Sequence, residues 1–207
     1  MMNWRLASRL SVITLAILVI VVVTLAQNNK GLFSGASAAA GLQGSDLGGI
    51  AAPNFTLTDQ NGTQVSLTQF RGRPVIVTFL YTHCPDQCPL TAERLHTALT
   101  NLGGDAAKVG VIAVSTDPKG DTADAAQKFT LQHNMQNYWH YLVGTQETLS
   151  PVWASYNVYA QGQQQSVDHT LAIYLIDKQG RQRSFFGGST FDPAHVTNDL
   201  KILLKEK

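Results

Sequence analysis

Residues 74–89 have the sequence PVIVTFLYTHCPDQCP, and this stretch decides the fold. Residues 74–81 are almost all β-branched or aromatic, which is typical of a central strand covered on both faces. Cys84 and Cys88 follow directly. Residues 91–102 then carry apolar side chains at helical spacing. The stretch therefore predicts a core strand, a cysteine pair and a helix, in that order.

The sequence after and before this segment predicts further strands. Asn61-Gly62 separates two short alternating runs, 55–58 and 63–66, which is a hairpin pattern. Other strands are expected at 109–115, 138–143 and 158–160, and a second hairpin from 170–177 and 183–186.

Three more helices are expected. They cover 121–133 with Asp121 as the cap, 145–155 with a break or kink at Pro151, and the C-terminal segment from Asp192-Pro193. Strands that alternate with helices predict an α/β domain. A cysteine motif between the first core strand and its helix fits a thioredoxin-like fold.

Composition excludes some classes of function. The chain has 207 residues with 15 Lys and Arg against 14 Asp and Glu, and no basic block. This balance is not that of a protein that binds nucleic acid. A hydrophobic content of 44% also argues against intrinsic disorder.

The N-terminus resembles an export signal. Residues 10–26 carry no charge, and Arg5 and Arg9 precede them. A positive flank places residues 1–9 in the cytoplasm and the rest outside it. We expect a single-pass transmembrane anchor in the cell membrane, with a cleaved signal peptide or a buried soluble helix as the alternatives. Residues 27–52, rich in Gly, Ala and Ser, predict a flexible tether before a domain at 53–207.

The cysteine pair itself allows three kinds of site. Two cysteines four positions apart at a helix entry share one helix face. The helix N-terminus lowers a thiol pKa, which favours redox exchange and metal binding alike. Zinc sites usually have four protein ligands, whereas two thiolates and one imidazole suit copper. Copper binding, thiol exchange and a structural disulfide all remain open at this point.

A third ligand must come from elsewhere in the chain. Among six histidines, His169 begins an apolar strand after the polar loop 161–167. A strand end allows a side chain to face a neighbouring strand–helix loop. His83 is the weaker candidate because it adjoins Cys84, and His96 is expected to be solvated.

Five motifs resemble the Sco/SenC family of copper chaperones for cytochrome c oxidase assembly. They follow the family order over about residues 53–206. They are FTLTDQNG at 55–62, a leucine and F-R-G element at 67–72, YTHCPDQCP at 81–89, STDPKGDT at 115–122 and DHTLAIYL at 168–175.

The resemblance implies a thioredoxin-like fold with an inserted hairpin, and a ligand set. Cys84 and Cys88 would supply sulfur, and His169 nitrogen, to one copper ion per chain. Asp86 would lie beside the metal, as a tuning group or weak fourth ligand. Asp168 would either orient the imidazole or be a solvated acid. In the motif at 115–122, Asp117 and Asp121 are expected in turn and cap roles.

The resemblance also implies partners. The chain would deliver copper to the dinuclear copper site of cytochrome c oxidase subunit II, with another copper carrier and a thioredoxin-like reductant as further partners. The alternative is a thiol–disulfide reductase that prepares the cysteines of that site. A peroxidase-like redoxin is disfavoured because the cysteines are paired.

Overall fold

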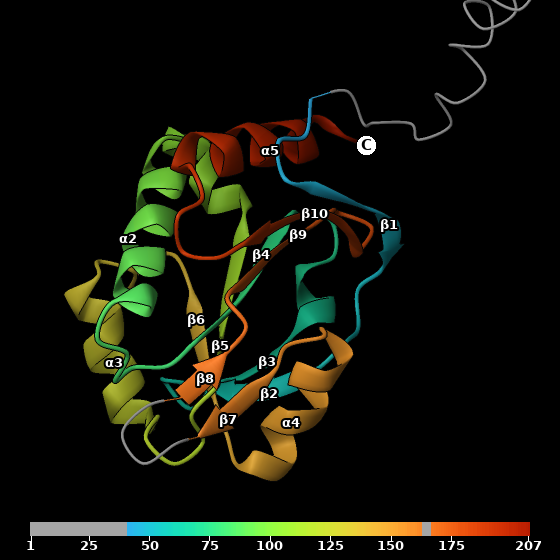
Figure 1. Cartoon of the computed structure of the whole chain (residues 1–207). Helices are drawn as coiled ribbons and strands as arrows, with labels where there is room; N and C mark the ends of the chain where they lie inside the picture. The colour runs from blue at the N-terminus through green and yellow to red at the C-terminus, as the bar shows by residue number, and fades with distance from the viewer. Residues whose placement is uncertain (1–40, 163–166) are drawn as a thin grey trace, which may run out of the picture. The chain divides into compact units, whose positions relative to one another are not determined.

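The computed structural model describes residues 41–162 and 167–207 (Figure 1). Its main feature is a mixed sheet of eight strands in the order β1-β10-β9-β4-β5-β6-β2-β3. The strands are β1 (Ser45–Ala51), β2 (Thr56–Asp59), β3 (Gln64–Ser66), β4 (Val75–Leu80), β5 (Gly110–Ser115), β6 (His140–Val143), β9 (Ala172–Ile176) and β10 (Arg181–Gly187). β4, β5 and β6 are parallel, and the other pairs are antiparallel. The predicted α/β class is confirmed.

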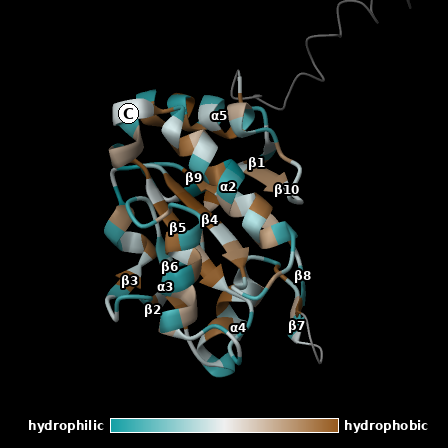
Figure 2. Ribbon diagram, turned by 90° about the vertical axis from the view of Figure 1, so that its left-hand side faces the viewer, coloured by the Kyte–Doolittle hydropathy of each residue, from teal (hydrophilic) through white to brown (hydrophobic). Residues whose placement is uncertain are grey.

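Helices cover both faces of this sheet. They are α2 (Gln87–Thr100), α3 (Ala123–Gln132), α4 (Gln146–Ser155) and α5 (Pro193–Lys205), with short 3₁₀ turns at η2 (Leu67–Phe70) and η3 (Gly103–Lys108). Ile76 and Leu80 belong to the apolar core under α2, α3 and α5, whereas Val77 and Phe79 belong to the core under α4. Alternate residues of β4 therefore point to opposite layers, and every residue of β4 is buried. Figure 2 shows the hydrophobic colouring concentrated on these central strands.

A separate two-stranded sheet lies between α4 and β9 in the sequence. Its strands are β7 (Ala160–Gly162) and β8 (Val167–His169), which pair in an antiparallel register. Residue His169 ends β8 rather than beginning the apolar strand, because the chain leaves β8 at Thr170 before β9 starts at Ala172.

The predicted tether over 27–52 is wrong for its last part. Ser45–Ala51 forms β1, which pairs with β10 at the edge of the sheet. Gln43 and Gly44 are held as well, because their backbone N–H groups donate to the buried carboxylate of Asp199. Residues 41–52 therefore belong to the folded domain. The sequence analysis predicted that this domain starts at residue 53, which is too late in the chain. Glycine-rich composition masked a strand that depends on tertiary pairing.

Two helix predictions also need correction. The cap of α3 is Thr122, whose hydroxyl accepts from Ala125 N–H, and Asp121 is buried one residue earlier. Of the break or kink predicted at Pro151, the break is wrong, because Pro151 lies inside the single helix α4. Leu149 and Trp153 bury one face of α4, and this packing compensates for the one backbone donor that proline lacks.

The predicted membrane anchor at 10–26 lies outside the described residues. Within residues 41–162 and 167–207, no helix is both long enough and apolar enough to span a bilayer.

Candidate metal centre

The cysteine motif occupies the turn between β4 and α2. Asp86 is the N-cap of α2, and its carboxylate accepts a hydrogen bond of 2.6 Å from Gln87 N–H. Cys88 lies in the first turn of the helix and is fully buried. Cys84 precedes the cap and is 8% exposed. Their spacing predicted that the two cysteines share one helix face. This prediction is wrong, because only Cys88 belongs to the helix. The turn before the helix brings them together.

The helix start makes the two thiols chemically different. Cys84 Sγ accepts from Cys88 N–H at 3.3 Å. The pKa of Cys84 is lowered to about 5, first by the hydrogen bond from the Cys88 thiol and then by backbone N–H groups and Tyr81, which together outweigh burial. The pKa of Cys88 is raised, because its thiol is hydrogen-bonded to Cys84 and is buried. The apo site thus holds one thiolate, at Cys84, and one thiol.

His169 completes the candidate ligand set. Its Nε2 atom lies 3.6 Å from Cys88 Sγ. Its Nδ1 atom lies 3.1 Å from the carbonyl oxygen of Thr170, to which it donates. Burial lowers the pKa of His169, so the imidazole is neutral and its Nε2 lone pair faces the sulfur. The edge-to-face contact with the Tyr81 ring, at 5.5 Å, also holds the imidazole.

One pair of candidate donor atoms, Cys88 Sγ and His169 Nε2, has a separation that suits a shared metal ion. With bonds of the lengths found at zinc sites, about 2.3 Å to sulfur and about 2.0 Å to nitrogen, two ligands at a trigonal angle lie roughly 3.7 Å apart. The 3.6 Å between Cys88 Sγ and His169 Nε2 agrees with this separation. Once metal binding displaces the proton of Cys88, two thiolates and a neutral imidazole form a soft donor set of the kind that copper prefers.

The site opens onto a cleft of about 290 Å³. Asp86 and Asp168, the two predicted accessory residues, both line this cleft beside Cys84 and His169. Asp86 caps α2, and Asp168 is an exposed residue of β8, directly before His169. Four of the five predicted site residues therefore line this cleft, and the fifth, Cys88, is buried next to Cys84 and His169.

The sequence interpretation missed Tyr81. This side chain lines the cleft, and burial together with the hydrogen bond to Cys84 raises its pKa to about 12. It therefore remains a protonated phenol that donates to the thiolate. The signal was present, because Tyr81 opens the YTHCPDQCP motif, but it was assigned to the strand.

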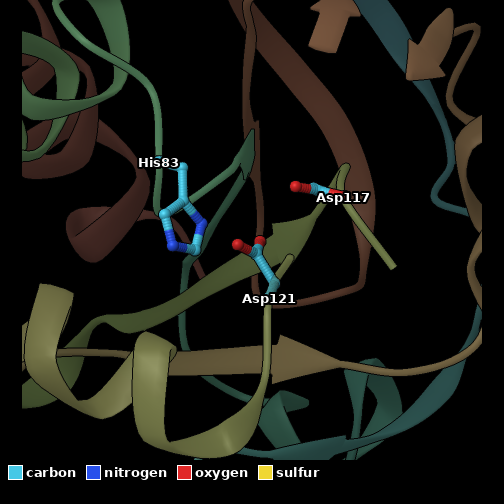
Figure 3. Close-up of side chains that lie close together, drawn as sticks. All are labelled: His83, Asp117 and Asp121. Atoms are coloured by element: carbon cyan, nitrogen blue, oxygen red, sulfur yellow. The ribbon is translucent and has the colours of Figure 1, made fainter. Parts of the chain in front are cut away.

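The other histidines lie apart from the cleft. His83 is exposed, and its ring nitrogen lies near carboxylate oxygens of Asp117 and Asp121 (Figure 3). His96 was expected to be solvated but is half-buried, with its ring against Tyr138.

The domain that carries this site is similar in sequence to known proteins. The SCO1/SenC family model matches residues 45–205. The mitochondrial SCO2 homolog of Bos taurus is 31% identical over 112 residues, which are 53% of this chain and 41% of that protein. SenC of Rhodobacter capsulatus is 28% identical over 150 residues, 70% of this chain and 65% of SenC. This chain therefore matches only part of the length of these curated relatives.

A solved structure matches the same domain. The structure of Bradyrhizobium japonicum ScoI with copper bound superposes with a TM-score of 0.67. The sequences are 34% identical, and the match covers 75% of this chain and all of ScoI.

Proposed function

Because the chain belongs to the SCO1/SenC family, we propose that it binds one copper ion through Cys84, Cys88 and His169. The observation that carries this proposal is the approach of His169 Nε2 to within 3.6 Å of Cys88 Sγ. These residues are 81 positions apart in the chain, and separate elements hold them. The relative from Bradyrhizobium japonicum, which has copper bound, supports copper as the metal.

The copper is cargo that the chain passes on. We propose delivery to the dinuclear copper site of cytochrome c oxidase subunit II, after loading by another copper carrier. Cys84 lines the cleft, whereas Cys88 is fully buried, so an acceptor thiolate reaches the ion from the Cys84 side. Exchange of one ligand at a time then moves the ion without releasing it to solvent.

The proposal includes a location. Residues 10–26 would anchor the chain in the cell membrane, with the copper domain outside the cytoplasm. Donor and acceptor would then share one membrane face, which raises their effective concentration without a large interface.

A second function, reduction of the acceptor's disulfide, is favoured by the difference between the two thiols. Cys84 is the thiolate that attacks an acceptor disulfide and forms a mixed disulfide. Cys88 then displaces the acceptor, which leaves with both thiols reduced, and a Cys84–Cys88 disulfide forms. A thioredoxin-like reductant would restore the pair. His169 has no necessary part in this reaction, which separates the two functions.

One transfer experiment tests both functions. The copper-loaded chain is mixed with metal-free subunit II, and the absorption of its dinuclear copper site is followed. The chaperone function predicts that this absorption appears while copper leaves the chain. It would be contradicted if this absorption did not appear, whereas the reduced metal-free chain gave oxidised subunit II free thiols and itself formed the Cys84–Cys88 disulfide, which is the reductase outcome.

A further inference from the structure

Asp121 lies at a junction of three parallel strands, next to the cysteine turn. Figure 3 shows its carboxylate close to His83 and Asp117, and ligand atoms of these three residues lie within 4.8 Å of one another. Asp121 is only 5% exposed. It follows β5, whereas His83 belongs to the turn after β4.

The hydrogen bonds of Asp121 show that it is not free to bind a cation. One oxygen, Oδ1, accepts from both the N–H and the hydroxyl of Thr82, at 2.8 and 2.7 Å. The other oxygen, Oδ2, accepts from the hydroxyls of Ser115 and Tyr141, at 2.6 and 3.0 Å. A carboxylate has about four acceptor positions, and four donors fill them. The carboxylate is therefore committed to the protein.

The four donors come from the ends of neighbouring strands. Thr82 follows β4, Ser115 ends β5, and Tyr141 lies in β6. Only Thr82 belongs to the turn that carries the cysteines. Asp121 therefore ties this turn to the sheet through the two hydrogen bonds that it accepts from Thr82.

We propose that Asp121 is a positioning residue for the copper site, because its carboxylate fixes Thr82 and thereby the cysteine turn relative to His169. This inference rests on the proposed function. Thr82 is two residues before Cys84, and the preceding residue, Tyr81, donates its backbone N–H to Cys88 Sγ at 3.5 Å. Release of Thr82 would loosen both sulfurs while His169, on a separate hairpin, stays in place.

The decisive variant is Thr82→Val in the full chain. It removes the hydroxyl donor, keeps the shape of the side chain and leaves Asp121 with its other partners. Loss of an outer contact of this kind weakens metal binding by about 10–100-fold. We expect a loss in this range for copper, measured against a competing chelator, together with a shift of the Cu(II)–thiolate absorption. Thr82→Ser keeps the hydroxyl and should restore both values.

Ser184→Ala is the matched control. Its hydroxyl donates at 2.6 Å to Asp199, a fully buried carboxylate on α5. Ser184→Ala should lower the unfolding midpoint about as much as Thr82→Val without changing copper affinity. Wild-type affinity in Thr82→Val, or equal losses of affinity in both variants, would overturn the proposal.

A metal-free measurement separates this inference from the proposed function. Cys88 is fully buried in the wild type. In the reduced apo chain, the rate of Cys88 alkylation should be at least several-fold higher in Thr82→Val than in Ser184→Ala. Equal rates would overturn the positioning role even if copper binds. If the wild type binds no copper but the rates differ, the copper function fails and the positioning of the cysteine turn stands.

Discussion

At the scale of single residues, the two cysteines differ more than their symmetric motif suggests. Cys84 accepts hydrogen bonds at the start of α2, and its pKa is lowered to about 5. Cys88, behind it, is fully buried and its pKa is raised. The electrostatic reason is that the negative charge of Cys84 is stabilised by the Cys88 thiol, backbone N–H groups and Tyr81, whereas a second charge beside it on Cys88 would be repelled and buried.

This difference predicts the pH dependence of alkylation in the reduced apo chain. Only the thiolate reacts, so the rate at Cys84 should rise as the pH passes about 5 and be nearly constant from pH 6 to 8. Cys88 should remain unmodified over this range. Mass spectrometry of peptides after timed iodoacetamide treatment measures both rates. A midpoint near pH 8.5 for Cys84, the value of a free thiol, would contradict the account.

At this scale, the sequence was sufficient to select the candidate ligands. Cys84 and Cys88 stand out by type and spacing, and His169 by its place after a polar loop. The Thr82–Asp121 contact could not be predicted, because it joins residues 39 positions apart. Nothing local distinguishes a buried carboxylate from a helix cap, and capping is the commoner role of an Asp at such a position.

At the scale of elements, the start of α2 and the end of β8 build the site together. The helix supplies N–H groups to Cys84, and the hairpin supplies His169 from the opposite side of the cleft. Elements with strong local patterns were predicted correctly, including the fully buried β4 and the β2–β3 hairpin. The strand β1 was missed, because its glycines give no alternating pattern and its pairing partner lies far along the chain.

The correction at β1 gives a prediction about where the domain begins. A chain that starts at residue 53 loses β1 and the two backbone donors to Asp199 from Gln43 and Gly44. A buried acceptor without its donors costs about 1–3 kcal/mol per lost bond. Urea unfolding should therefore show a chain from 53 to be less stable by at least about 3 kcal/mol than a chain from 41. Equal midpoints would mean that β1 is dispensable.

At the scale of the whole molecule, the turn after β4 of the main sheet and the separate β7–β8 sheet present the two halves of the site at one cleft. The formal net charge of +1 offers little long-range attraction to a charged partner, so specificity must come from the cleft and from shared location. If the proposed function holds, copper should link the two halves, because it would bind both the cysteine turn and the β7–β8 hairpin in the folded state only.

Copper should accordingly stabilise the folded chain. A ligand that binds only the native state at 100 times its dissociation constant adds about 2.7 kcal/mol to the free energy of unfolding. We expect the melting temperature of the wild type to rise when copper is added. It should return to the metal-free value when a strong chelator removes the copper. Calorimetry of Cys88→Ser, which lacks one sulfur, should show a much smaller rise. An unchanged melting temperature with copper in the wild type would contradict binding at this site.

The most direct test of the central claim is a copper titration of the reduced chain, with wild type, His169→Ala and His83→Ala compared. His83 is an exposed histidine next to Cys84 and serves as the matched control. The account predicts one copper per wild-type chain with a Cu(II)–thiolate absorption that is unchanged in His83→Ala. In His169→Ala, the absorption should be lost or strongly altered. If His169→Ala bound copper with wild-type affinity and spectrum, His169 would not be a ligand and the account would be wrong.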